Sequence, residues 1–530
     1  MAAPRHNFCL IIGGGVSGLV QAAELLRHRT LKREGLHILE RAEDYGGVWK
    51  AATYPGAACD VFSILYQVSW HRNPAWKNLF PNRDELVDYY RQFADYYHLR
   101  ESTTFKQNVL EATWLPDEML WRVECEDVET HEKTLWTANV LIQAVGTYNR
   151  KKIPKLPGID SFEGDIWHTL DWPAKFDFTN KRVAYIGTGP TSLQALPLIQ
   201  SQTDSVTIYM RSMTYCHPFR DFQYPAWLLW VFGRIPGVLS VYAALVSFFF
   251  GIWAWFVFRP NSFLAKQEEA RCKKHLTKTV SDPDLRAKLK PIGRFGAKRP
   301  LVSDTFFKLV QQANVSVVSE DLVGVTTDGI TSQSRQPLET PTDTAGVPQL
   351  RQTNRPFDVI IWGTGFLMQG WGSMVPTRGL NGTLLSDHWA DEPETLYGTM
   401  TSNFPNLIIL NGPNTVTPWG SLIRGVERQA MHARRLMKLI HARSASSPTG
   451  RYAIMPKPGF EDLWTESLQS ELDTLATSTR FGPGFYYLSK SGRNTFFFPF
   501  TQSYYAWRTL WIKEEEYTAW HGSAKAEEGV

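Results

Sequence analysis

Short apolar runs that end in glycine are the most regular pattern along this chain of 530 residues. Residues 8–12 form such a run, which continues into the glycines of 13–18 and then into helically spaced apolar positions over 19–29. The same order returns at residues 182–186 and 187–192. A buried strand, a glycine turn and a helix in this order predict the unit that opens a Rossmann-like domain. Two copies predict an α/β protein with two such domains.

The rest of the hydrophobic pattern predicts further elements. Residues 105–145 alternate as strands, and residues 84–98 have the spacing of an amphipathic helix. Residues 358–366 form another apolar run that ends in glycine, which predicts a second strand returning to a nucleotide turn. The polar composition of residues 331–353 and 444–449 favours loops.

Residues 235–258 form a strongly apolar run without a charged side chain, bounded by Arg234 and Arg259. The run exceeds the ~18 apolar residues that suggest a transmembrane helix. A single crossing would separate residues 182–211 from residues 298–366, although both are expected in the second domain. We therefore expect either a buried helical subdomain, which we favour, or a helical hairpin or re-entrant segment in contact with a membrane. Basic residues that follow the run could meet anionic headgroups.

Composition argues against several classes of protein. The chain has 56 basic and 52 acidic residues, a net charge of +4, and so lacks the excess of positive charge typical of nucleic-acid binding. Its five cysteines have no C-x-x-C or zinc-type spacing, so we expect reduced thiols, no bound metal and a protein that faces the cytoplasm. The first apolar run is too short for a secretory signal. No pattern defines the oligomeric state.

The first glycine turn has the spacing of a dinucleotide site. Gly13, Gly15 and Gly18 fit G-x-G-x-x-G, in which the first glycine allows the tight turn, the second lets the backbone approach a pyrophosphate, and the third permits close packing of helix on strand. The following strand ends in Glu40, a carboxylate placed to accept a hydrogen bond from a ribose hydroxyl.

The second glycine turn has the same spacing as the first, except that serine occupies its third small position. The strand that follows it ends in Arg211 rather than in an acidic residue. Arginine at this place favours NADP over NAD, because it accommodates the additional phosphate. The residues of the turn are Gly187, Gly189, Pro190, Thr191 and Ser192, the last standing where glycine or alanine is usual.

Between the two turns lies a string that reads F-x-G-x-x-x-H-x-x-x-W-P and runs from Phe162 to Pro173. A loop with a proline stop accounts for these two ends. It gives no reason for His168 and Trp172 to stand four residues apart between two dinucleotide folds. Together with Gly164, these residues resemble the signature of the type I Baeyer–Villiger flavin monooxygenases, and the chain is similar to fungal members of secondary metabolism.

The resemblance extends over residues 7–430 and implies FAD and NADPH as cofactors. Residues 46–49 and 54–60 match the segments that wrap the flavin in the family, although Ala58 stands where arginine is usual. Residues 298–300 match its K-R-P segment. The implied cofactor-binding residues are Gly13, Gly15, Ser17, Gly18, Glu40, Gly47, Val48, Trp49, Tyr54, Asp60, Gly187, Gly189, Pro190, Thr191, Ser192, Arg211, Lys298 and Gly365.

The resemblance also implies a reaction with Arg299 and Asp60 as catalytic residues. NADPH reduces FAD, the reduced flavin takes up O2 as a flavin peroxide that Arg299 holds, and Asp60 orients the arginine. Insertion of one oxygen atom next to a ketone carbonyl then gives an ester or lactone. The aromatic richness favours a small hydrophobic ketone, which we expect near Trp419. The signature string is expected to couple motion of the two domains.

Two other interpretations stay open. A heteroatom-oxygenating (N/S) or hydroxylating flavin monooxygenase would share both turns but would not need Arg299. A catalytically inactive nucleotide-binding or membrane-associated scaffold would need neither catalytic residue. A disulfide reductase is disfavoured, because Cys59 has no partner nearby in the sequence.

The predicted architecture is α/β, with two Rossmann-like domains of the three-layer β/β/α type and a helical insertion in the second. We expect an FAD-binding domain from residues 1–150 and 390–530, and an NADP-binding domain from residues 151–216 and 296–389. Residues 217–295 are expected to form the apolar insertion. The protein is expected on the cytoplasmic side, either soluble or associated peripherally or re-entrantly with a membrane.

Overall fold

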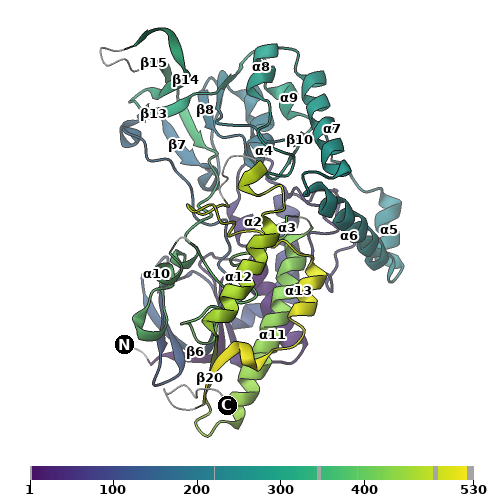
Figure 1. Ribbon diagram of the computed structural model, residues 1–530, viewed down its shortest axis with the longest axis vertical. Coiled ribbons are helices and arrows are strands. Elements are labelled where there is room, and N and C mark those ends of the chain that lie inside the picture. The colour runs from purple at the N-terminus through teal and green to yellow at the C-terminus, as the bar shows by residue number, and fades with distance from the viewer. Residues whose placement is uncertain are drawn as a thin grey trace.

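The computed structural model describes residues 3–219, 221–342, 348–390, 392–418, 420–481 and 487–521 (Figure 1). Its larger sheet is built around β1, which pairs in parallel with β2 on one side and β6 on the other. An antiparallel meander of β4, β5 and β6 extends the sheet. The strands in spatial order are β17 (Thr377–Arg378), β4 (Gln107–Leu115), β5 (Leu120–Asp127), β6 (Lys133–Gln143), β1 (Arg5–Ile12), β2 (Leu36–Leu39) and β3 (Thr103–Thr104), with β18 (Leu407–Ile409) paired to β6.

The helix α1 (Val16–Arg27) packs against β1 and against α3 (Arg83–Tyr96) and α11 (Leu422–Ser446), and buried residues of all three helices belong to the core cluster of this sheet. The predicted helix near residues 84–98 is therefore confirmed as α3. It begins with a capping box, in which the Asn82 side chain accepts from the Glu85 amide and the Glu85 side chain accepts from the Asn82 amide. The short α2 (Val48–Ala51) packs against α3.

The smaller sheet is entirely parallel and carries the second glycine turn. Alternate residues of β8 point to opposite layers: Val183 and Tyr185 join the core beneath the helices, whereas Ala184 and Ile186 join the core beneath an antiparallel sheet. This arrangement confirms the predicted β/β/α layering. The strands in order are β12 (Val315–Val318), β9 (Ser205–Tyr209), β8 (Arg182–Ile186), β16 (Val359–Trp362) and β7 (Asp165–His168); the outer strands are β13 (Asp321–Val325), β14 (Gly329–Thr342) and β15 (Pro348–Pro356), and the helices are α4 (Pro190–Ile199) and α9 (Phe306–Leu309).

Composition predicted two loops, and the structure corrects the first and part of the second. Residues 331–342 and 348–353 fall in the antiparallel pair β14–β15, and residues 444–446 complete the last turn of α11, whereas residues 447–449 lie beyond the helix as predicted. An outer antiparallel layer tolerates polar residues, because only one of its faces is buried. The signature string is also not a loop throughout, since its residues 165–168 form β7 at the edge of the smaller sheet.

Four helices lie between β10 (Cys216–His217) and β11 (Leu301–Val302), two strands that pair in parallel, so this segment leaves and rejoins the second domain at one place. Its longest helix, α6, is not the buried helix that we favoured. Only 17% of its most apolar stretch is buried, and it is the one helix of the described residues long and apolar enough to cross a membrane. The helices are α5 (Ala226–Arg234), α6 (Val238–Val257), α7 (Phe263–Thr279) and α8 (Pro283–Lys288).

The C-terminal part of the chain packs into the core of the larger sheet. Aromatic side chains from residues 496–498, together with Tyr487 and Tyr505, belong to the same hydrophobic cluster as β1 and β6. The elements of this region and of the preceding connection are α10 (Leu385–Trp389), β19 (Tyr452–Pro456), α12 (Pro458–Leu472), α13 (Gln502–Arg508) and β20 (Tyr517–His521), and β19 pairs with β20.

Candidate active site

The first glycine turn joins β1 to α1 with very little free space. Gly13 has a φ of 111°, and a Cβ there would lie 2.6 Å from the Ala144 carbonyl oxygen. A Cβ on Gly18 would overlap the Gly13 carbonyl oxygen, so the helix can approach the strand only because Gly18 has no side chain. Gly15 faces the backbone of Gly47, where a Cβ on Gly15 would lie 3.4 Å from the Gly47 Cα.

Glu40 lies beside this turn, at the carboxyl end of β2. Its Oε2 accepts from the Gly14 amide (2.5 Å) and its Oε1 accepts from the Ala42 amide (2.7 Å). Burial raises the pKa of Glu40, while the two backbone donors act in the opposite direction. The carboxylate is therefore held in a fixed orientation next to the turn, as expected for a ribose-binding residue.

The neighbouring Gly47–Trp49 segment is fixed by a residue that the sequence did not reveal. Arg83, at the start of α3, donates from Nε to the Trp49 carbonyl oxygen (3.0 Å) and from Nη2 to the Lys50 carbonyl oxygen (3.0 Å). The Trp49 indole donates to the Tyr66 hydroxyl (3.2 Å). Val48 opens the short helix α2 immediately after Gly47.

At the second turn, α4 begins with Pro190, whose missing N–H costs nothing at the first helical position. Ser192 is fully buried, and its hydroxyl donates to the Gly189 carbonyl oxygen (2.6 Å). A Cβ on Gly189 would meet nothing within 4 Å, which leaves open space at the start of α4. Thr191 follows in the first turn of the helix.

Lys298 and Arg211 lie close enough to interact, although they are 87 positions apart in the sequence. Burial is the main cause that lowers the pKa of Lys298 to about 8, and the positive charge of Arg211 lowers it further. The Lys298 ammonium also donates to the Ser212 hydroxyl (2.8 Å). Two facing cations at the end of β9 are the arrangement that an additional phosphate would stabilise.

Arg299 and Asp60 form an ion pair between the two halves of the molecule, the half built on the larger sheet and the half built on the smaller sheet. The Arg299 Nη2 donates to Asp60 Oδ1 at 2.6 Å. The Asp60 side chain is 25% exposed and that of Arg299 is 51% exposed, so an exposed pair of this kind adds little stability. Its significance lies in position, because it brings together the two residues predicted to be catalytic.

The loop that carries Asp60 is held by α4 through Gln194, a second residue that the sequence did not reveal. The Tyr54 hydroxyl donates to Gln194 Oε1 (2.8 Å), and Gln194 Nε2 donates to the Ala58 carbonyl oxygen (2.9 Å). A Cβ on Gly56 would lie 2.7 Å from the Gln194 carbonyl oxygen, so Gly56 allows the close approach. Tyr54 thus contacts the second domain through its hydroxyl, and burial raises its pKa to about 12.

The signature string contacts both halves of the molecule. The buried His168 accepts from the Leu170 amide through Nδ1 (3.1 Å), which leaves Nε2 as the donor to the Gly365 carbonyl oxygen (2.9 Å). The Trp172 carbonyl oxygen accepts from the Thr53 hydroxyl (3.3 Å), so the string reaches the loop that precedes Asp60. A Cβ on Gly164 would lie 2.5 Å from a backbone oxygen, which explains the glycine.

Other predicted residues stand further from these contacts. Phe162 packs in the core between the two sheets of the second domain, and Ser17 is buried in the first turn of α1. Pro173 follows the 3₁₀ turn that ends at Asp171. Trp419, expected near the substrate, lies outside the described residues.

The described residues fit two dinucleotides. Both glycine turns stand at the carboxyl ends of parallel strands, where ligands bind in doubly wound sheets. Beyond the end of β6, the Thr147 hydroxyl is buried and has no hydrogen-bond partner, which marks a place for a polar ligand atom. At the second turn, the open space at Gly189 and the paired cations Lys298 and Arg211 suit a phosphate.

Comparison with known proteins gives the same result. The sequence profile of the flavin-binding monooxygenase-like family matches residues 7–238. The FAD-binding monooxygenase BOA2 of Botryotinia fuckeliana is 35% identical over 478 residues, which cover 88% of this chain and 86% of that protein. A Baeyer–Villiger monooxygenase of Pseudomonas aeruginosa is 30% identical over 499 residues, covering 94% and 88%. The closed crystal structure of cyclohexanone monooxygenase has the same fold, with a TM-score of 0.81 at 22% identity and coverage of 98% and 100%.

The fold and the two glycine turns thus define a flavoprotein with two dinucleotide-binding domains. The similarity to these relatives along most of their length shows that the chain belongs to the Baeyer–Villiger monooxygenases. It is an NADPH-dependent FAD monooxygenase, and the family predicted from the signature string is confirmed.

Proposed function

We propose that this enzyme inserts one oxygen atom of O2 next to the carbonyl of a small hydrophobic ketone, giving an ester or lactone. The observation that carries the proposal is the hydrogen bond from Arg299 to Asp60, which brings together the two residues expected to be catalytic. A charged donor fixed by a carboxylate is suited to hold negative charge on a reacting oxygen.

The two halves of the molecule take different cofactors in this proposal. FAD lies against Gly13–Gly18 and Glu40 in residues 1–150 and 390–530, and NADPH lies against the turn that opens α4 in residues 151–216 and 296–389. When bound, FAD would accept hydride from NADPH and activate O2. Lys298 and Arg211 bind the phosphate that distinguishes NADPH from NADH.

Arg299 is the catalytic residue that touches the reacting oxygen. Its guanidinium has five N–H donors, and Asp60 accepts from Nη2. A planar guanidinium whose orientation is fixed by a carboxylate is suited to stabilise a developing oxyanion. Burial of the surrounding Cys59 and Tyr66 keeps part of the site away from water, which strengthens these interactions.

The signature string would couple the NADP-binding half to the flavin site. His168 is held to the end of β16 through Gly365, and the Trp172 carbonyl oxygen is held to Thr53. A shift of the smaller sheet would therefore be transmitted to the loop that ends at Asp60. We infer a positioning role for both residues and no chemical step.

The helical segment 217–295 bears on where the enzyme works. We infer the cytoplasmic side, with contact to a membrane surface through residues 235–258. The strands β10 and β11, at the two ends of this segment, pair with each other. If α6 crossed a bilayer as a single span, the two ends of the segment would have to lie on opposite sides of the membrane, so we exclude a single span. A hydrophobic ketone from secondary metabolism would be available at such a surface.

The test is anaerobic reduction of the purified yellow enzyme by NADPH, followed by admission of O2 with a panel of cyclic and polycyclic ketones and mass detection of products. The proposal expects an ester or lactone that carries one oxygen atom from O2. Oxygenation of amines or sulfides in the same panel, with ketones untouched, would instead assign a heteroatom monooxygenase. A colourless protein that does not oxidise NADPH would assign a scaffold.

A further inference from the structure

One side of α5 and α6 exposes an unusual set of apolar side chains. Their exposed fractions lie between 43% and 67%, although single exposed apolar residues are the rule elsewhere on soluble proteins. In Figure 1 the two helices form the right-hand edge of the molecule, away from both sheets. We call this set the α5–α6 face: Trp227, Trp230, Ile235, Val241, Leu245, Phe248, Phe249, Ile252 and Phe256.

The opposite side of α6 is attached to the protein. Leu239 and Ala243 are buried in a small cluster with Ile64 and Leu65, and Ala254 and Val257 join the main core. The helix therefore lies along the surface with one stripe anchored and the other uncovered. A helix that is apolar all round suits a buried position or lipid, and its uncovered stripe has no protein around it within the described residues.

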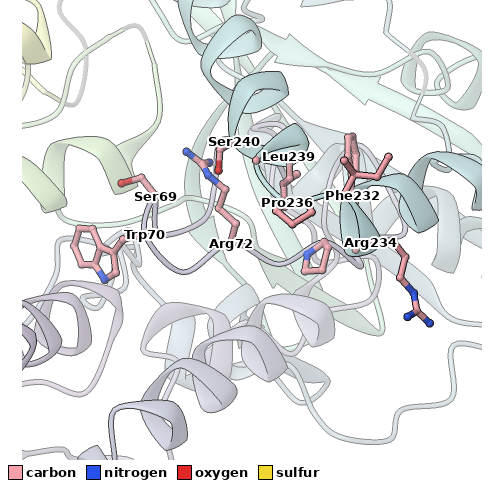
Figure 2. A pocket seen from close by; sticks show the side chains of 12 residues that line it. Ser69, Trp70, Arg72, Phe232, Arg234, Pro236, Leu239 and Ser240 are labelled. Carbon is pink, nitrogen blue, oxygen red and sulfur yellow. The ribbon is translucent and has the colours of Figure 1, made fainter.

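The charged side chains along the sequence of α5 and α6 are all basic. Residues 222–267 contain no aspartate or glutamate, but they contain Arg234, Arg259 and Lys266. A cavity of about 390 Å³ opens at the turn between α5 and α6, and Figure 2 shows Arg72, Arg234 and Ser240 among the side chains that line it.

Arg72 is the partly buried cation of this cavity. Its Nε is buried and makes no hydrogen bond. The nearby Glu427 carboxylate is itself buried and accepts from the Ser69 amide. The cavity thus combines two arginines with an adjacent apolar face, which is complementary to a phosphate attached to an acyl chain.

We propose that the α5–α6 face docks into one leaflet of a bilayer that contains anionic phospholipid. The apolar side chains enter the acyl region, the exposed Trp227 and Trp230 lie at the headgroup level, and Arg72 and Arg234 meet lipid phosphates. This inference deepens the membrane contact proposed above and does not depend on ketone chemistry.

The anchored side of α6, opposite the docked face, contacts the loop that follows Asp60. The Phe250 ring on α6 lies 5.6 Å from the Phe62 ring, centroid to centroid, and Phe62 follows Asp60 by two positions. A ketone dissolved in the leaflet would therefore be close to the loop that carries Asp60.

The experiment is flotation of the full-length holoenzyme with vesicles of phosphatidylcholine alone or mixed with phosphatidylserine. Leu245→Glu places a charge on the α5–α6 face, where Leu245 is 51% exposed. Leu463→Glu is the matched control, because Leu463 is 64% exposed on α12 and lies outside the face. Flavin absorbance and NADPH oxidation check that each variant is folded, and sedimentation velocity without vesicles gives the oligomeric state.

The proposal expects the wild type to float with the anionic vesicles, Leu245→Glu to lose about tenfold or more in partitioning, and Leu463→Glu to behave as the wild type. Arg72→Gln is expected to weaken binding to anionic vesicles and to leave binding to neutral ones unchanged. A wild type that stays with the soluble fraction, or floats no better than Leu245→Glu, would overturn it. So would a wild-type dimer that Leu245→Glu converts to monomers while neither binds vesicles, since a second copy would then cover the face.

Discussion

The Arg299 guanidinium donates to the Asp60 carboxylate at 2.6 Å, although 239 positions separate the two residues in the sequence. This hydrogen bond joins the loop that carries Asp60 to the segment just before β11. Catalysis is expected to depend on Arg299 more than folding does, because the Arg299 side chain is 51% exposed.

Arg299→Ala is therefore expected to bind FAD and NADPH as the wild type does and to oxidise NADPH, but to release hydrogen peroxide in place of ester. Loss of a donor to a developing oxyanion lowers the rate by about 10²–10³. Product mass and peroxide yield, measured with Arg299→Lys as a control for charge without the planar fork, check this expectation. Ester formation by Arg299→Ala at the wild-type rate would remove the assignment.

Lys298 is expected to make NADPH binding dependent on pH. Its pKa of about 8 means that the free enzyme carries the charge below this pH and loses it above. Because only the ammonium attracts a phosphate, the KM for NADPH is expected to rise as pH passes above about 8, by up to tenfold per pH unit, while the KM for NADH stays nearly constant.

The matched variants for this dependence are Lys298→Arg, which keeps its charge, and Arg211→Ala. Lys298→Arg is expected to flatten the rise in KM above pH 8, and Arg211→Ala to reduce the preference for NADPH over NADH at every pH. A rise of equal steepness for NADPH and NADH would show that a different group titrates.

Substitution by alanine is expected to have different effects at Gly18 and at Gly189. Gly18→Ala is expected to lower stability and FAD content together, since the new Cβ would overlap the Gly13 carbonyl oxygen. Gly189→Ala meets nothing within 4 Å, so it is expected to keep the thermal stability and the flavin spectrum and to raise only the KM for NADPH. Thermal unfolding, flavin absorbance and steady-state kinetics separate the two, and a Gly189→Ala protein with unchanged KM would contradict the placement of the pyrophosphate.

The parts of the fold that could be predicted from the sequence are those determined by residues close together along the chain. A glycine turn constrains its own backbone, so the β1–α1 and β8–α4 units could be identified from an apolar run, the glycine spacing after it and the helical spacing that follows. The capping residue Asn82 likewise marks the start of α3. The pair Arg299–Asp60 was reached through the family resemblance, because no local pattern connects residues so far apart.

What the sequence did not show depends on long-range packing. Gln194 has the spacing of an ordinary helical residue, and only the approach of the loop from Tyr54 gives it two partners in the other half. The strand β7 was not predicted within the signature string, because its partner strand β16 lies nearly 200 positions further along the chain. The prediction that α6 is buried was also wrong, because apolar composition describes a core helix and a lipid-facing helix equally well.

His168 is expected to stabilise the native state in a way that acid removes. The residue is 1% exposed, and burial lowers its pKa, so the native protein keeps it neutral where the unfolded chain would protonate it. As pH falls from about 6.5 toward the lowered native pKa, the unfolded state binds the additional proton and stability decreases.

His168→Phe leaves the Gly365 carbonyl oxygen without its donor, which costs about 1–3 kcal/mol near neutral pH. Because phenylalanine does not titrate, the difference in urea midpoint between wild type and variant should shrink at about pH 5.5. His441→Gln, an exposed position on α11, is the control and should keep the wild-type dependence; a constant difference at both pH values would show that His168 does not titrate with unfolding.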